Sequence, residues 1–125
     1  MPVSRRNFEQ LGLPVGPYAH AVVHGDTLYT SGFTAFGTNA QTLDARAQTA
    51  AVLDQLEVIA QEHERTLRDL VKVTVFVCDP ADIPGIRTAL AERYGDAVPA
   101  SSLVMVSGLF APELRVEIEA VIAMP

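Results

Sequence analysis

Residues 70–78 read LVKVTVFVC, and the alternation in this stretch is typical of a β-strand. The odd positions 71, 73, 75 and 77 are all valine, whereas the even positions carry Lys72, Thr74, Phe76 and Cys78. Asp79-Pro80 follows and ends the strand. The period of two therefore predicts a strand with one face made of valines and one face of mixed character.

Two amphipathic helices are predicted on either side of this strand. Upstream, apolar residues recur at intervals of three and four between residues 44 and 64, with acidic and amide side chains on the other side. Downstream, a helix begins after Asp82 or at Pro84 and ends at Gly95. The inward residues of this second helix are Ile83, Ile86, Leu90 and Tyr94.

Four further strands complete the expected fold. Residues 18–24 and 27–31 form a hairpin around Gly25-Asp26, and residues 98–108 and 114–123 form two later strands. This order of elements predicts an α+β fold with two helices on one face of a sheet. Aliphatic residues on the other face, such as Val104 and Val106, then need a second cover, which another copy of the subunit supplies.

Composition restricts the class of protein. A chain of 125 residues with 49% hydrophobic residues is expected to form a single domain over residues 1–125. Its net charge is −6, and its nine Lys and Arg residues are scattered, so nucleic-acid binding is not expected. We also expect no membrane segment, no secretory signal and a cytoplasmic location, with which the single cysteine, Cys78, agrees.

A metal site is not expected from the histidines. His20 and His24 stand four residues apart, but along a strand this spacing is about 13 Å, too far for both rings to bind one ion. Solvent-facing or cleft-lining positions are the favoured interpretation for both. Cys78 has no histidine near it in sequence and is interpreted as a small core residue.

Two charged residues stand at apolar positions. Glu119 lies between Ile118 and Ala120, where desolvation would raise its pKa and favour proton transfer near neutral pH. The alternative is an ion pair of Glu117 or Glu119 with Arg115 or with another subunit. Arg87 falls on or beside the apolar stripe of its helix, either as a snorkelling side chain or as a guanidinium directed into a cleft.

Several short motifs, in order, resemble the reactive intermediate deaminase (Rid) family over roughly residues 14–123. They are Gly16-Pro17-Tyr18, Thr30-Ser31-Gly32, Arg46-Ala47-Gln48-Thr49, residues 71–77, Pro99-Ala100-Ser101-Ser102 and residues 116–120. The resemblance implies a chorismate-mutase-like subunit of the bacillus type, with a mixed, mostly antiparallel sheet. It also implies a homotrimer with three clefts between neighbouring subunits.

The resemblance further implies a chemistry. Members of the best-known branch hydrolyse small enamines and imines, such as 2-aminoacrylate, to a keto acid and ammonia without a cofactor. Carried over to this chain, Tyr18 and Ser31 would supply hydrogen bonds from the cleft wall, and the Gly32 carbonyl would lie near the reacting nitrogen. The backbone N–H of Leu103 would serve the site, and Glu119 would orient and activate water.

The chain departs from the family pattern at the residue that binds the substrate carboxylate. That residue is an arginine in the best-known branch and is Ser101 here. Losing such a pair costs about 2–5 kcal/mol of binding, so efficient deamination of a small 2-imino acid is not expected. Arg87, where that branch carries a cleft-facing asparagine, is a candidate for a relocated cation.

Two functions remain open from the sequence. The first is a cofactor-independent enzyme for an imine, an enamine or a related intermediate that is larger or less acidic than 2-aminoacrylate, with Phe33 and Phe36 lining an enlarged pocket. The second is a trimer that binds a small metabolite without turning it over, as a sensor or a pathway auxiliary. RNA cleavage, an activity attached to some names in the family, is disfavoured by the acidic charge.

Overall fold

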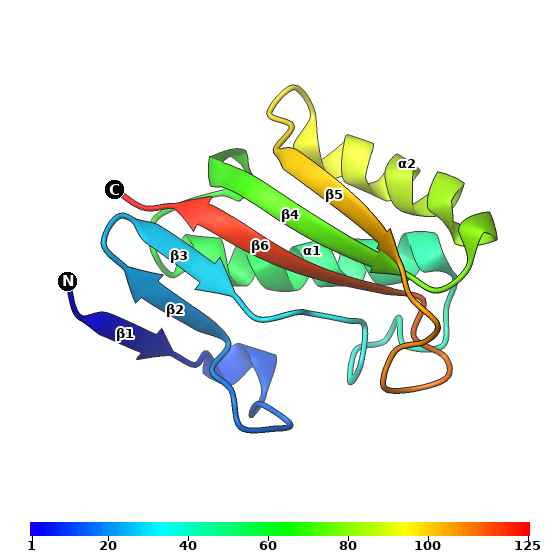
Figure 1. Cartoon of the computed structure of the whole chain (residues 1–125), viewed down its shortest axis with the longest axis horizontal. Coiled ribbons are helices and arrows are strands. Elements are labelled where there is room, and N and C mark those ends of the chain that lie inside the picture. The colour runs from blue at the N-terminus through cyan, green and yellow to red at the C-terminus, as the bar shows by residue number, and fades with distance from the viewer.

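The computed structural model describes residues 1–125 as one six-stranded sheet with two long helices on one of its faces (Figure 1). The strands follow the spatial order β1-β2-β3-β6-β4-β5. Only the β4–β5 pair is parallel, since α2 crosses over between these two strands. The predicted α+β class and the mixed, mostly antiparallel sheet are therefore confirmed. The elements are β1 (Val3–Arg6), β2 (Ala21–His24), β3 (Thr27–Thr30), α1 (Ala45–Gln61), β4 (Leu70–Val77), α2 (Ile83–Tyr94), β5 (Ala100–Met105) and β6 (Val116–Ala123).

Local sequence accounts for the ends of the helices. The Asp44 carboxylate accepts a hydrogen bond of 2.9 Å from the N–H of Ala47 and so caps the first turn of α1. Gly95 ends α2 with a φ of 59°, a conformation that residues with a side chain rarely adopt. α1 ends at Gln61, three residues before the predicted end, and a turn follows it.

The core lies between the sheet and the helices, and β6 contributes one face to it. Its alternate residues Val116, Ile118, Ala120 and Ile122 are buried, as the period of two predicts. On α1, Val52, Leu53, Leu56 and Ile59 are completely buried against them. Burial of such aliphatic side chains stabilises the fold by about 1.5–3 kcal/mol each.

Two features of the sheet differ from prediction. A β-bulge in β4 separates Leu70 from Lys72, so Leu70 turns inward while Val71 is 51% exposed. The prediction that Val71 shares a face with the other valines was wrong for this reason. β1 was not predicted, because its four residues, VSRR, carry no apolar alternation and are held by pairing with β2.

The sheet face opposite the helices, which we term the open face, has no cover within the chain. All six residues of β5 are exposed, including Val104, which pairs with Phe76 on this face. Val106 lies just past the end of the strand and is half-buried. The uncovered aliphatic surface expected from the sequence is therefore present at Val104. None of the helices is long and apolar enough to cross a membrane.

Candidate functional site

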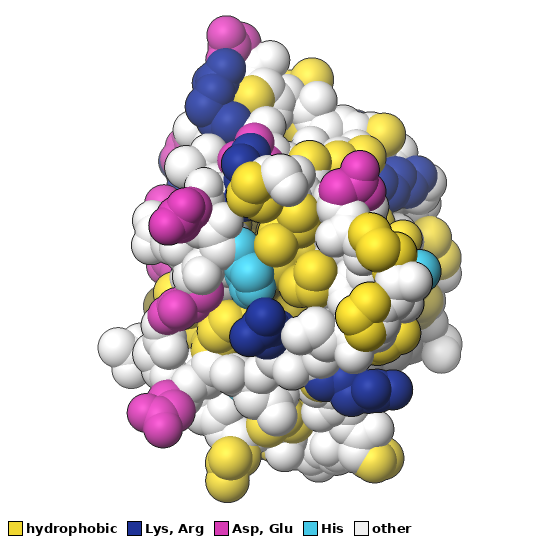
Figure 2. Space-filling model, turned by 90° about the vertical axis from the view of Figure 1, so that its left-hand side faces the viewer, with side chains coloured by type: hydrophobic (Ala, Val, Ile, Leu, Met, Phe, Trp, Pro, Cys, Tyr) yellow, Lys and Arg dark blue, Asp and Glu magenta, His cyan; other side chains and the backbone are white.

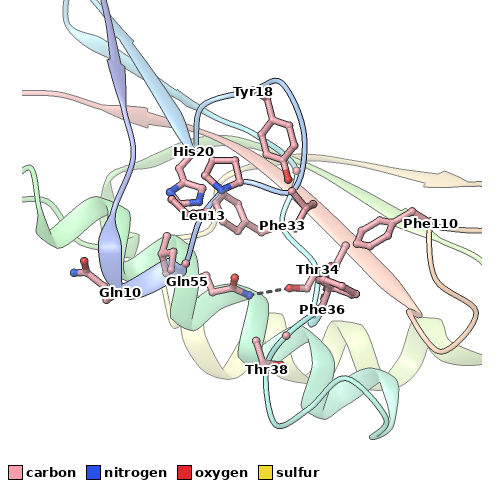
Figure 3. A pocket seen from close by; sticks show the side chains of 16 residues that line it. Gln10, Leu13, Tyr18, His20, Phe33, Thr34, Phe36, Thr38, Gln55 and Phe110 are labelled. Atoms are coloured by element: carbon pink, nitrogen blue, oxygen red, sulfur yellow. Dashed lines mark hydrogen bonds between the residues drawn. The ribbon is translucent and has the colours of Figure 1, made fainter.

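A cavity of about 420 Å³ opens between the N-terminal loop and the segment that follows β3 (Figure 3). Its walls come from residues 10–15, 32–34 and 36–38, together with Tyr18, His20, Gln55 of α1 and Phe110 of the loop before β6. None of its 16 lining residues is Asp, Glu, Lys or Arg. The cavity is thus formed from aromatic, aliphatic and uncharged polar side chains, among them Phe33 and Phe36, whereas the pocket predicted for these two rings was one beside Ser101.

Gly32 forms the boundary between this cavity and a carboxylate on β6. Two backbone hydrogen bonds between Phe33 and Ile118, of 2.9 and 3.0 Å, hold the segment after β3 against β6. Gly32 consequently lies against Glu117, and a Cβ added at Gly32 would stand 2.5 Å from Glu117 Oε2. Only glycine gives the carboxylate this close approach to the backbone.

Glu117 has the electrostatic environment that the sequence analysis expected for Glu119. Its side chain is half-buried, and desolvation together with the nearby negative charge of Glu119 raises the pKa of Glu117. Glu119 lies two residues further on the same face of β6, opposite Thr74, and it is exposed. In the single chain water reaches the Glu119 carboxylate. Glu119 lies on the open face, so its desolvation between subunits stays a prediction.

Ser31 precedes Gly32 in the chain, and Tyr18 lines the same cavity as Gly32. The Ser31 hydroxyl donates a 2.6 Å hydrogen bond to the carbonyl of Ala19, and the Ser31 N–H donates to the carbonyl of His20. Ser31 therefore fastens the loop before β2 to the end of β3. Tyr18 lines the cavity with 44% of its surface exposed, and its hydroxyl remains free for a ligand.

The other predicted site residues lie at a different place on the chain. Ser101 and Leu103 belong to β5, which is separated from β3 by β4 and β6, about 14 Å across the sheet. Arg87 is exposed on α2, where its neighbour Ile86 supplies the buried contact instead. None of these three residues lines the cavity. Arg87 therefore does not point into the cavity of its own chain.

Sequence reasoning missed three polar groups, of which only Gln55 lines the cavity. Glu117 was considered only as an ion-pair partner, although it carries the raised pKa. Gln55 was assigned to the solvated side of its helix, but it lines the cavity and donates a 2.8 Å hydrogen bond to the carbonyl of Thr34. On the open face, Lys72 Nζ donates a 2.8 Å hydrogen bond to Ser102 Oγ, which places a cation beside the second serine of the pair.

Comparison with known proteins assigns the family. The family model described as endoribonuclease L-PSP matches residues 10–124. The chain belongs to this family. It contains the Rid proteins, so the resemblance seen in the sequence motifs is confirmed.

Relatives in the family carry deaminase names. A 2-iminobutanoate/2-iminopropanoate deaminase of Escherichia coli is 31% identical over 112 residues, which are 86% of this chain and 87% of the relative. A 3-aminoacrylate deaminase of Acinetobacter baylyi is 32% identical over 111 residues, 86% of this chain and 87% of the relative.

Solved structures of the family agree with the fold. A Pseudomonas aeruginosa protein of unknown function superposes with a TM-score of 0.89 at 34% identity, covering 98% of this chain and 93% of its own. RidA of an Antarctic Psychrobacter superposes with a TM-score of 0.80 at 28% identity, covering 90% of this chain and 92% of its own.

Proposed function

We propose that this protein is a cofactor-independent deaminase that hydrolyses an imine or enamine of a small molecule. The observation that carries the proposal is the Glu117 carboxylate, which is half-buried, has a raised pKa and packs against Gly32 at the edge of the cavity. A carboxyl group with a raised pKa is a stronger base when ionised and keeps its proton to higher pH, which favours both steps of general acid–base catalysis. The deaminase names of two relatives support the same reaction class.

The reaction consumes one water molecule, and the proton that Glu117 takes from this water must be passed on to the leaving nitrogen. Protonated Glu117 gives its proton to the carbon of an enamine, or to the nitrogen of an imine, and an iminium ion forms. Water then adds to the iminium carbon while the Glu117 carboxylate accepts a proton from it, which leaves a neutral carbinolamine. Glu117 passes this proton to the nitrogen and takes the hydroxyl proton as the carbon–nitrogen bond breaks, so the products are a carbonyl compound, ammonia and protonated Glu117. Glu119, expected from the sequence to activate the water, acts in this scheme through its charge, which helps to raise the pKa of Glu117.

The substrate is a neutral or weakly acidic compound larger than 2-aminoacrylate. Ser101 cannot bind a carboxylate as arginine does, and the cavity has no cation among its lining residues. The cavity has room for a ring-bearing group beside Phe33 and Phe36. A pocket of this size and lining is typical of a small-molecule site.

A complete site requires a second copy of the chain. Arg87, Ser101 and Leu103 lie away from the Gly32–Glu117 edge within one chain. The open face and β5 are uncovered, as expected of a subunit interface. We therefore include in the proposal a homotrimer. In it, Arg87, Ser101 and Leu103 of a neighbouring copy close the cleft beside Gly32 and Glu117. Light scattering of the purified protein tests this, and a monomer at micromolar concentration would contradict it.

RNA cleavage is not favoured, although the family description names it. The net charge is −6, and on the end of the molecule shown in Figure 2 the basic side chains are dispersed among acidic and hydrophobic ones without forming a stripe. Binding of a nucleic-acid backbone depends on clustered cations.

The test measures carbonyl and ammonia release from imines made in situ. An amino-acid oxidase supplies imino acids of alanine and phenylalanine, and an amine oxidase supplies benzylimine, which has no carboxylate. We expect the protein to accelerate hydrolysis of benzylimine more than that of the alanine imine. Glu117→Gln should lower the rate about 100-fold or more, as is usual for loss of a general acid–base group.

Glu119→Gln is the matched control, because it makes the same change in charge two residues away. It should retain activity within a few-fold of the wild type. If Glu119→Gln is inactive and Glu117→Gln is active, Glu119 and not Glu117 is the residue that activates the water. Hydrolysis at the rate of buffer alone for every imine would support the second function, a trimer that only binds a metabolite.

A further inference from the structure

His20 occupies a special position in the cavity wall. Its ring is only 3% exposed and lies between the rings of Phe8 and Phe33, at centroid distances of 6.1 and 5.8 Å. It is nevertheless one of the residues that line the cavity, as Figure 3 shows. A polar ring that is almost wholly buried but faces a cavity has one route left for hydrogen bonding, which is to a ligand there.

The backbone fixes the tautomer of this histidine. The N–H of Phe8 donates a buried 3.0 Å hydrogen bond to His20 Nδ1, which must therefore be an acceptor. In a neutral imidazole the proton then lies on Nε2. The aromatic surroundings favour the neutral ring, and burial lowers the pKa of His20 accordingly.

The Nε2–H group has no partner within the protein. None of the protein's hydrogen bonds involves this atom; those of His20 use its Nδ1, its backbone N–H and its carbonyl. Only two side-chain nitrogen or oxygen atoms are both without a partner and closed to solvent, Arg65 Nε and the Tyr94 hydroxyl oxygen. His20 Nε2 also lacks a partner but does not belong to this group, so part of its surface is open. Because His20 lines the cavity, we take the cavity as the side from which Nε2 is reached.

Gln55 supplies the complementary group. Its amide nitrogen donates to the carbonyls of Thr34, at 2.8 Å, and Ala51, at 3.2 Å, so both N–H groups are used. This fixes the orientation of the amide and leaves Gln55 Oε1 as an acceptor. Gln55 and His20 both line the cavity, which thus offers one fixed donor and one fixed acceptor (Figure 3).

Two further aromatic rings line the cavity at a distance from His20. Phe36 and Phe110 come from different loops and meet edge to face at 5.1 Å, and they are 43% and 61% exposed. Exposed aromatic rings at a cavity wall are suited to contact with another ring. In Figure 3 they lie on the side away from His20.

We propose that His20 Nε2–H and Gln55 Oε1 together bind an uncharged amide-like group of the substrate, with Phe36 and Phe110 packing against its ring. Such a group carries both an acceptor and a donor, which match the two protein atoms. A carboxylate carries acceptors only and would be repelled by Gln55 Oε1. This inference rests on the proposed function, for which it names the substrate class, a ring-bearing imine or enamine with an amide or lactam group.

The first experiment requires no variant and no ligand. Two-dimensional ¹⁵N NMR of the histidine rings at pH 7 distinguishes the two neutral tautomers and the charged form. We expect His20 to be neutral with its proton on Nε2. A proton on Nδ1, or a charged ring, would overturn the inference, since the donor would then be absent or directed elsewhere.

The second experiment compares benzamide with benzoate, two probes of nearly equal size. Titration of the wild-type protein at pH 7 should show benzamide binding at least about tenfold more tightly, because only it satisfies both groups. His20→Phe should abolish the preference. His63→Phe is the matched control, because His63 also contacts the ring of Phe8, at 5.9 Å, but does not line the cavity.

The outcomes separate this inference from the proposed function. Equal binding of the two probes, or tighter binding of benzoate, overturns the inference even if imines are hydrolysed. A protein that prefers benzamide but releases no ammonia from any imine retains the binding site and loses the reaction. If His20→Phe does not fold, the NMR experiment and the wild-type titration still decide the question.

Discussion

The contact between Gly32 and Glu117 predicts a measurable coupling between these two positions. In Gly32→Ala the new Cβ would stand 2.5 Å from Oε2, 2.9 Å from Cδ and 3.1 Å from Cγ of Glu117. The glutamate must therefore move away. Because the atoms met are the far end of a flexible, half-buried side chain, this costs about 1 kcal/mol, the low end for overpacking. The backbone at Gly32 is not in the left-handed region, so alanine itself recovers about 0.4–1 kcal/mol from the unfolded state. The net change in stability should therefore be a loss of less than about 1 kcal/mol.

The double variant isolates this contact. Glu117→Ala removes all three atoms that the new Cβ would meet. In that background Gly32→Ala should be stabilising by about 0.4–1 kcal/mol, which gives a coupling of about 1 kcal/mol between the two substitutions. Urea unfolding followed by circular dichroism, at one fixed protein concentration, measures the four stabilities.

Gly108→Ala is the control for a glycine in open space, since a Cβ there meets nothing within 4 Å. It should change stability by a few tenths of a kcal/mol, and equally with and without Glu117. An equal loss of stability from Gly32→Ala in both backgrounds would refute the contact on which the proposed site depends. Loss of deaminase activity in Gly32→Ala with Glu117 present is the functional counterpart.

Three other predictions concern single side chains. Because the folded protein raises the pKa of Glu117 above 4.5, its contribution to stability is full below that value and is lost as pH rises through the folded pKa. Glu117→Gln should therefore raise the urea midpoint relative to wild type at pH 7, and should raise it less at pH 4. The same difference in urea midpoint at both pH values would contradict this. The buried hydroxyl of Tyr94 has no partner, and burial raises its pKa to about 12. Tyr94→Phe should thus be neutral or stabilising by about 1 kcal/mol, and a clear fall in Tm would reveal a hidden partner. Gln48 is fully buried and joins the carbonyls of Gln41, Leu43 and Glu113 to the N–H of Arg115. Gln48→Leu should cost about 3 kcal/mol or more by the same unfolding assay, whereas a loss under 1 kcal/mol would mean that water replaces these bonds.

Local patterns predicted the elements that carry the core. The period of two in β6 placed Val116, Ile118 and Ile122 inward, and the three- and four-residue spacing in α1 did the same for its buried face. Such patterns succeed because a residue's face is fixed by its own backbone conformation. They failed at Val71, since the bulge that turns it outward arises from pairing with β6.

The candidate site could be predicted only in part. The motifs in the sequence indicated Tyr18, Ser31 and Gly32, and the structure brings these three together. They assigned the water-activating role to Glu119, whereas the raised pKa is that of Glu117, two residues away on the same face of β6. His20 was predicted to be solvent-facing or cleft-lining, but its partner Phe8 is twelve residues away, and their hydrogen bond follows from no local pattern.

By itself, the sequence determined the α+β class, the family, and the absence of an arginine at position 101. The tertiary structure alone decided which carboxylate is desolvated, where Arg87 points, and which ring nitrogen of His20 carries a proton into the cavity. The physical reason is the distance along the chain over which the deciding interactions act. Backbone conformation and side-chain period are set by neighbours in the chain, whereas desolvation and hydrogen-bond partners depend on segments that meet only after folding.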